Sequence, residues 1–141
     1  MTGPKRPHPL RVLVVDDERI YTRRLALEFE EAGFSARTAF DGQEALDALE
    51  SEVPDLIVLD VRMPNMDGIA CLRNLHARLG DDTPPVILLT GDLTSRVDTA
   101  SLVYPGSFVL SKPCSYATVI RTARRLLERT GRDQSSVRSA R

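Results

Sequence analysis

Tryptophan is missing from this chain of 141 residues, and cysteine occurs only twice. Cys71 and Cys114 do not form a CxxC pair and have no partner histidines, so neither a zinc site nor a structural disulfide is indicated. We expect both side chains to be reduced thiols in the core of a cytoplasmic protein.

Long apolar runs are also missing. No segment approaches the roughly eighteen apolar residues of a transmembrane helix, and no apolar stretch follows the basic N-terminus as in a secretory signal. The nucleotide-binding patterns GxxxxGK[ST] and GxGxxG do not occur. The composition, with 42% hydrophobic and 28% charged residues, is typical of one globular domain that does not contact a membrane.

The net charge of −1 conceals an uneven distribution of charged residues. Residues 1–120 contain 18 acidic and 12 basic side chains, whereas residues 121–141 contain seven arginines and two acidic residues. A basic end of this kind suits an acidic partner or a nucleic acid. Because residues 131–141 contain no aromatic anchor, we favour a solvated helix face with a flexible tail, and we do not expect nucleic-acid binding.

Apolar runs alternate along the chain with segments in which apolar residues recur at helical spacing. The runs predict strands that are buried on both faces, except for a more polar strand near a sheet edge. Five such units in order predict an α/β fold with a parallel, doubly wound sheet and helices on both faces. The predicted strands are 11–15, 35–39 (the edge strand), 55–59, 86–90 and 107–110, and the predicted helices are 18–33, 41–52, 68–80, 93–103 and 115–130.

Polar residues follow four of the five predicted strands. In parallel sheets of this class, ligands bind beyond the carboxyl ends of the strands. Taken singly, each of these residues has an ordinary explanation as a helix cap or a turn residue. Their occurrence together at one edge favours a shared site. Asp16, Asp17 and Glu18 follow the first strand, and Asp60 follows the third. Thr90 ends the fourth strand and is followed by Gly91 and Asp92, and Lys112 and Pro113 follow the fifth.

The chemistry of these residues indicates phosphoryl transfer with a bound cation. Clustered carboxylates repel one another, and oxygen ligands suit Mg²⁺. Lys112 and Thr90 can hold phosphoryl oxygens, and Gly91 leaves the backbone open to close approach. Asp60 would then be the nucleophile that receives the phosphoryl group.

These stretches resemble the receiver domain of two-component response regulators. VLVVDDE resembles the acidic pair that follows the first strand in that family, and DLIVLDVRMPNMDG resembles its phosphoacceptor stretch. VILLTG carries its Ser/Thr position and LSKP its Lys-Pro pair. The resemblance covers residues 10–130. Residues 1–9 are expected to be a disordered arm and residues 131–141 a flexible tail.

The resemblance implies a flavodoxin-like (βα)5 fold with strand order 2-1-3-4-5. It also implies phosphorelay signalling, in which Asp60 accepts a phosphoryl group from a histidine kinase or a histidine phosphotransfer protein. Thr90 and Lys112 would hold the phosphoryl oxygens, and the Lys112–Pro113 peptide bond would be cis. Such a chain is not an enzyme beyond its own phosphoryl transfer and autodephosphorylation. It would be a cytoplasmic monomer, or a phosphorylation-dependent dimer, that switches a downstream protein.

The resemblance further implies a bound Mg²⁺, for which Mn²⁺ is expected to substitute. Its ligands would be Asp16, Asp17, Asp60 and the backbone carbonyl of Arg62. Together with Gly91 and Asp92, Arg62 would modulate the lifetime of the acyl phosphate. We expect an ion pair between Arg62 and Asp92 across the mouth of the site.

The resemblance is incomplete at the face that would report phosphorylation. The family usually has an aromatic switch residue three positions before the lysine, and here that residue is Val109. Phe108 is adjacent, but strand alternation predicts that it points to the opposite face. An altered output face involving Phe108, Val109 and Tyr104 is therefore expected.

Other functions remain open from the residues alone. A phosphatase of the haloacid-dehalogenase type would need a second aspartate two residues after the nucleophile, where this chain has Arg62. A phosphorylation-independent interaction module of the same fold is the main alternative, because Val109 removes the usual switch. The chain is also compatible with the N-terminal part of a longer regulator that carries an output domain.

Overall fold

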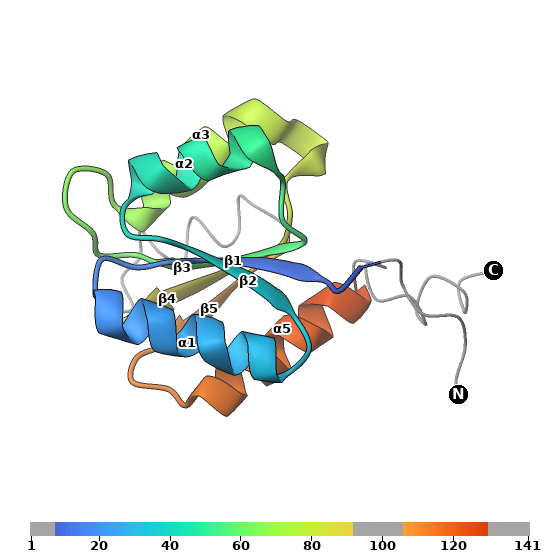
Figure 1. Ribbon diagram of the computed structural model, residues 1–141. Coiled ribbons are helices and arrows are strands. Elements are labelled where there is room, and N and C mark those ends of the chain that lie inside the picture. The colour runs from blue at the N-terminus through green and yellow to red at the C-terminus, as the bar shows by residue number, and fades with distance from the viewer. Residues whose placement is uncertain (1–7, 92–105, 130–141) are drawn as a thin grey trace.

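The computed structural model describes residues 8–91 and 106–129. Strands and helices alternate along this part of the chain (Figure 1). The predicted helix over 93–103 lies outside the described residues. The strands are β1 (Arg11–Val15), β2 (Ser35–Ala39), β3 (Leu56–Asp60), β4 (Val86–Thr90) and β5 (Ser107–Ser111); the helices are α1 (Arg19–Glu31), α2 (Gly42–Ser51), α3 (Gly68–Leu79), the 3₁₀ turn η1 (Gly80–Asp82) and α5 (Tyr116–Arg129).

The five strands form one parallel sheet in the order β2-β1-β3-β4-β5. This confirms the predicted doubly wound fold and its strand order. The edge position of β2 is also confirmed, because only Ala39 of that strand is fully buried. All residues of β3 and β4 are buried, as expected for central strands covered on both faces.

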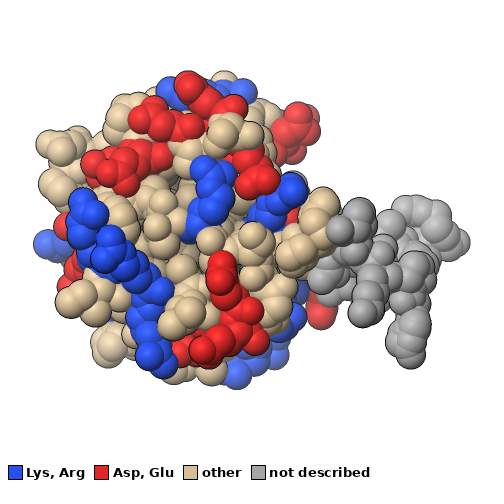
Figure 2. All heavy atoms as spheres, viewed as in Figure 1, with Lys and Arg blue, Asp and Glu red and all other residues tan. Residues whose placement is uncertain are grey.

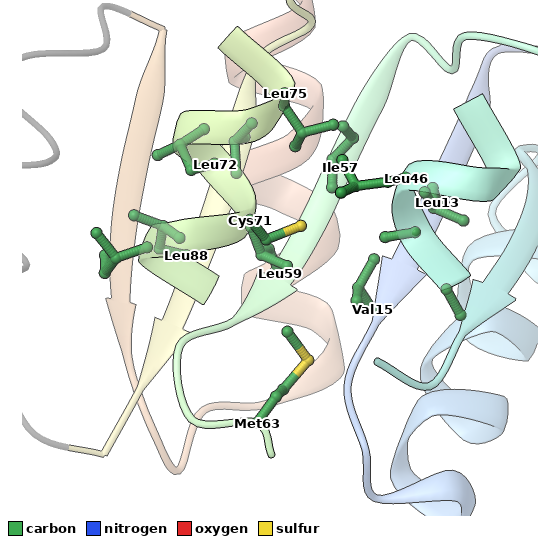
Figure 3. Packing of buried hydrophobic residues seen from close by; sticks show 14 of the residues in the cluster. Leu13, Val15, Leu46, Ile57, Leu59, Met63, Cys71, Leu72, Leu75 and Leu88 are labelled. Carbon is green, nitrogen blue, oxygen red and sulfur yellow. The ribbon is translucent and has the colours of Figure 1, made fainter. Parts of the chain in front are cut away.

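Side chains of alternate strand residues build two separate cores. On one face, Leu13, Ile57 and Leu88 pack beneath α2 and α3 (Figure 3). On the other face, Val14 and Val58 pack with the apolar sides of α1 and α5. Figure 1 shows these helix pairs on opposite sides of the sheet. The period of two along each strand therefore determines which helix pair each residue contacts.

The start of α2 is held by reciprocal hydrogen bonds. Asp41 Oδ1 accepts from the Glu44 amide at 2.7 Å, and Glu44 Oε1 accepts from the Phe40 amide at 2.9 Å. This pattern is a capping box in which the glutamate reaches one residue beyond the cap.

The third strand is shifted by one residue from its predicted range of 55–59. Asp60 is its last residue and pairs with Leu89 of β4, and the Val61 amide still donates to the Leu89 carbonyl at 3.0 Å. The apolar run ends at Leu59, but the backbone hydrogen bonds to β4 continue. The carboxylate of Asp60 is therefore attached to a rigid strand end and not to a loop.

The β3–α3 connection returns tightly to the end of β3. Met63 of this connection is buried in the core beneath α2 and α3. The Gly68 amide donates to the Val61 carbonyl at 2.8 Å, and a Cβ at Gly68 would lie 2.4 Å from the Asp60 carbonyl oxygen. The φ of Gly68 is not positive, so backbone conformation does not require glycine here. Close backbone approach is the reason for glycine at this position.

Replacing Gly68 with alanine should therefore lower the free energy of unfolding by about 1–3 kcal/mol, the usual cost of overpacking. The added Cβ would press on backbone atoms of Asp60 and Val61, which cannot move aside as a flexible side chain can. The matched control is Gly91→Ala, where an added Cβ meets no described atom within 4 Å. Urea unfolding of the two variants measures the difference. Equal stability of both would contradict the close-approach explanation.

The charges of α1 oppose its helix dipole. Arg19, Arg23 and Arg24 occupy its first half, and its acidic residues follow toward the end, whereas a helix favours the reverse order. Figure 2 shows the basic side chains as a band across the beginning of this helix. The guanidinium carbons of Arg19 and Arg23 lie 4.2 and 5.4 Å from the centre of the Phe40 ring.

None of the described helices combines the length and the apolar character that a membrane crossing requires.

Candidate functional site

The sheet register brings the predicted strand-end residues to one rim. Val15 pairs with Leu59, so Asp16 follows β1 beside Asp60 at the end of β3. Thr90 pairs with Ser111 at the ends of β4 and β5, and Lys112 comes next. The Lys112 amide donates to the Thr90 carbonyl at 2.7 Å, which extends this pairing by one more hydrogen bond.

Three of the rim side chains are buried although they are polar. Asp16 is 1% exposed, Asp60 5% and Thr90 4%. Asp17 is exposed beside them. Buried polar groups are costly unless they are paired, so the contacts between them define what the site can do.

The ammonium of Lys112 lies among the carboxylates. Its Nζ is 2.9 Å from Asp60 Oδ1 and 3.2 Å from Asp16 Oδ2, and Glu18 Oε1 is 3.9 Å away. The Tyr21 ring centre lies 5.2 Å from the same Nζ. Lys112 therefore links the end of β5 to the ends of β1 and β3.

Burial raises the pKa of Asp60 to about 6. The hydrogen bond from Lys112 opposes this effect, and the negative charges of Asp16 and Asp17 add to it. Burial also raises the pKa of Asp16, against the hydrogen bond from the Glu18 amide and the charge of Lys112. The site thus carries more negative charge than Lys112 compensates.

The pKa of Lys112 is also raised, which in a lysine favours the charged form. Burial alone would lower it, but the hydrogen bond to Asp60 and the charges of Asp60 and Asp16 raise it above its ordinary value. Lys112 is therefore charged throughout the physiological pH range.

The donor set fits a hard divalent cation. One carboxylate oxygen from each of Asp16, Asp17 and Asp60 lies within 4.8 Å of the other two. Carboxylates at this spacing, with water completing the shell, suit Mg²⁺. The raised pKa values of Asp16 and Asp60 point the same way, because a cation would stabilise the ionised form of these buried carboxylates.

The remaining predicted site residues are divided between the described and undescribed parts of the chain. Arg62 and Gly91 are exposed, and the Lys112–Pro113 peptide bond is cis, the isomer implied by the resemblance. Asp92 and Tyr104 lie outside the described residues, and so does the expected ion pair between Arg62 and Asp92.

Val109, at the usual switch position, and its neighbour Phe108 point to opposite faces of the sheet, as strand alternation predicts. Val109 is partly buried against the core beneath α2 and α3. Phe108 is 41% exposed, and Leu110, two residues later, packs with the core of α1 and α5. Phe108 therefore does not fill the place of an aromatic residue at position 109.

The thiols differ in their surroundings. Cys71 is a free thiol in the core, as expected, and burial raises its pKa to about 11. Cys114 is also free but only partly buried, which corrects its assignment to the core.

Two residues near the site were not anticipated from the sequence. Tyr21 covers the Lys112 ammonium with its ring, and the Thr22 hydroxyl contacts the backbone of the β1–α1 loop. They are the third and fourth residues of α1, where their helical spacing indicates only packing. The one available signal was the position of Thr22 four residues after Glu18, which allows a bond to the Glu18 carbonyl.

Curated relatives of this chain are response regulators. Response regulator MprA of Mycolicibacterium vanbaalenii is 39% identical over 132 residues, which are 94% of this chain and 56% of the relative. Response regulator MprA of Mycobacterium avium is 39% identical over 121 residues, which are 86% of this chain and 52% of that relative. The chain thus spans about half the length of the curated relatives it matches.

Solved structures with the same fold are receiver domains and chemotaxis proteins. The receiver domain of the Francisella response regulator 1452 superposes with a TM-score of 0.76 at 35% identity, covering 87% of this chain and 99% of that one. Vibrio cholerae chemotaxis protein CheY4 gives a TM-score of 0.78 at 27% identity, covering 84% and 99%. The sequence profile of the response regulator receiver domain matches residues 12–124. The chain therefore belongs to the response regulator receiver domain family, whose members are signalling domains of two-component systems.

Proposed function

We propose that this receiver domain accepts a phosphoryl group on Asp60 from a phosphohistidine, with Mg²⁺ bound, and thereby switches its interaction with a partner protein. The observation that carries the proposal is the contact of Lys112 with both Asp60 and Asp16 beside a third carboxylate. A nucleophile, a phosphate-binding ammonium and a cation site meet there at one point.

The proposed transfer forms one bond and breaks one. An oxygen of the Asp60 carboxylate attacks phosphorus, the N–P bond of the phosphohistidine breaks, and the imidazole nitrogen keeps the electron pair. Lys112 already lies at hydrogen-bonding distance from Asp60 Oδ1, so it can move to a phosphoryl oxygen over a short path. The buried Thr90 stands at the end of the neighbouring strand, where its hydroxyl can donate to a second oxygen.

A bound Mg²⁺ would neutralise charge on the phosphoryl oxygens during this transfer. Asp16, Asp17, Asp60 and the backbone carbonyl of Arg62 are its proposed ligands, and Mn²⁺ is expected to substitute. The rigid end of β3 holds Asp60 in place, and the tight return of the chain at Gly68 keeps the loop of Arg62 close to it. Positioning and charge compensation are the main contributions that phosphoryl transfer needs from a protein.

The proposed phosphodonor is a histidine kinase or a histidine phosphotransfer protein, in accordance with the family, and it implies a cytoplasmic location. The response regulators that this chain matches are about twice as long as the matched region. An output domain joined to this receiver is therefore part of the proposal, beside a separate downstream protein as its target. Val109 suggests that the signal leaves the site by a route other than an aromatic residue at that position.

Acetyl phosphate with Mg²⁺ tests the proposal directly. Intact mass spectrometry of the wild-type protein should show the addition of one phosphoryl group, which should disappear when EDTA is present. The same treatment of Asp60→Asn should give no adduct, because its amide is not a nucleophile. A wild-type protein without an adduct would leave a phosphorylation-independent interaction module as the better interpretation.

Asp55→Asn provides a matched control. Asp55 precedes β3 at the opposite end of the sheet, where its Oδ2 accepts from the Arg11 amide at 2.8 Å. This variant should acquire the phosphoryl group as the wild type does. An adduct that persists in Asp60→Asn, or that is lost in Asp55→Asn, would contradict the assignment of Asp60.

A further inference from the structure

Thr22 stands out among the buried polar residues. The described part of the chain buries four polar or charged side chains, of which Asp16, Asp60 and Thr90 belong to the candidate site. The fourth is Thr22, with an exposure of 0%. Because burying a hydroxyl is unfavourable without a partner, its contacts indicate why a threonine occupies this position.

The Thr22 hydroxyl contacts two backbone carbonyls, one at the start of α1 and one in the loop before it. Its Oγ1 lies 2.7 Å from the Glu18 carbonyl, a contact that threonines in helices often make with the preceding turn. It also lies 2.8 Å from the Asp16 carbonyl, outside the helix. Asp16 is 1% exposed, so its carbonyl depends on a protein donor in place of bulk water.

The beginning of α1 lacks the usual capping contacts. Its N-cap residue, Glu18, makes no side-chain capping bond within the described residues, and no acidic residue occupies the first turn. The three arginines in the first half of α1 are unfavourable at a helix N-terminus (Figure 2). On the other side of the loop, Asp16 Oδ1 accepts from the Glu18 amide at 3.1 Å. The Thr22 hydroxyl therefore closes the loop from within the helix.

We infer that Thr22 is a positioning residue for the acidic pair: its hydroxyl holds the backbone that aims the Asp16 and Asp17 carboxylates at the cation, and so sets the affinity for Mg²⁺. The inference rests on the proposed function, of which the cation is a part. Removing groups that orient metal ligands typically weakens metal binding by about 10–100-fold. Because Thr22 acts through backbone, we expect the lower end of that range.

The test is a Mg²⁺ titration followed by two-dimensional amide NMR and by calorimetry. Thr22→Val keeps the shape of the side chain and removes the donor, and it should bind Mg²⁺ about tenfold more weakly than the wild type. Thr22→Ser restores the hydroxyl and should bind with nearly wild-type affinity. In Thr22→Val, the amide signals of the β1–α1 loop should shift before any Mg²⁺ is added.

Thr122→Val is the matched control. Thr122 Oγ1 donates to the carbonyl of Thr118, four residues earlier in α5, at 2.8 Å. This is the bond that Thr22 makes to Glu18, without the second contact that Thr22 makes to Asp16. This variant should keep wild-type affinity for Mg²⁺. If Thr22→Val does not fold, Thr22→Cys, which retains a weak donor, should show an intermediate loss of affinity.

The possible outcomes are distinct. Wild-type affinity in folded Thr22→Val or in Thr22→Cys, failure of serine to restore binding, or an equal loss in Thr122→Val would each overturn the role of Thr22. A wild-type protein that does not bind Mg²⁺ would instead refute the cation site of the proposed function, and this inference with it.

Discussion

Replacing Lys112 with methionine is expected to lower the free energy of unfolding of the metal-free protein by about 3–5 kcal/mol at neutral pH, the usual cost of leaving a buried charge without its partner. Methionine keeps the length of the side chain but removes the ammonium that lies 2.9 Å from Asp60 and 3.2 Å from Asp16. The two carboxylates then face each other and Asp17 without that compensation. Urea unfolding in EDTA measures the loss.

Two further measurements distinguish this cause from lost packing. Mg²⁺ should restore much of the stability of Lys112→Met, because a cation can replace the missing positive charge. The double variant Lys112→Met, Asp60→Asn should be more stable than Lys112→Met alone, because one of the facing charges is gone. If neither Mg²⁺ nor the second substitution raises the free energy of unfolding of Lys112→Met, the loss of stability comes from packing of the lysine stem and not from charge.

Removing the Lys112 ammonium should also slow phosphoryl transfer. In Lys112→Met, the rate of adduct formation from acetyl phosphate should fall by about 100-fold, as is common when one donor to developing charge is removed. The comparison should be made at saturating Mg²⁺, so that a weaker cation site does not account for the result. An unchanged rate would exclude Lys112 from the transfer step.

Asp60→Asn is expected to stabilise the metal-free protein although it removes the proposed nucleophile. The Asp60 pKa of about 6 lies roughly two units above the ordinary value of 3.8, so the ionised form is unfavourable in the folded state. At about 1.4 kcal/mol per unit, the neutral amide should add about 1–3 kcal/mol to the free energy of unfolding at pH 7.5. Saturating Mg²⁺ should reduce this difference, because the cation stabilises the carboxylate.

The pH dependence of the difference has a defined sign. Between pH 3.8 and about 6 the folded state retains the Asp60 proton that the unfolded chain has lost. The folded state therefore binds more protons, and the contribution of Asp60 to stability is lost as the pH rises through about 6. The advantage of Asp60→Asn over the wild type should be clearly smaller at pH 4.5 than at about pH 6, and should change little from there to pH 7.5. A difference that is constant across this range would show that Asp60 titrates normally.

Most of the fold could be predicted from local patterns. The apolar runs of β1, β3 and β4 identify central strands, and the polar pattern of β2 identifies an edge strand. The strand-end residues at positions 16, 60, 90 and 112 were recognised because each follows such a run. The boundary of β3 was wrong by one residue, since hydrogen bonds to β4, and not apolarity, determine where that strand ends.

Other features could not be read from the sequence, because they depend on distances between separate segments. Gly68 has no unusual φ, and its need for glycine arises only from the approach of α3 to the Asp60 carbonyl. The role of Thr22 becomes visible only when its hydroxyl is seen beside the Asp16 carbonyl. The Tyr21 ring against the Lys112 ammonium is a similar case.

The sequence by itself determined which residues follow the strands of this receiver domain, because the period of a strand or helix depends only on neighbours along the chain. The tertiary structure alone decided how these residues act on one another. Asp16 and Lys112 are 96 residues apart, and only the strand order and register bring their charged atoms within 3.2 Å. The raised pKa of Asp60 has the same origin, since burial and neighbouring charges are properties of the folded assembly and not of any segment.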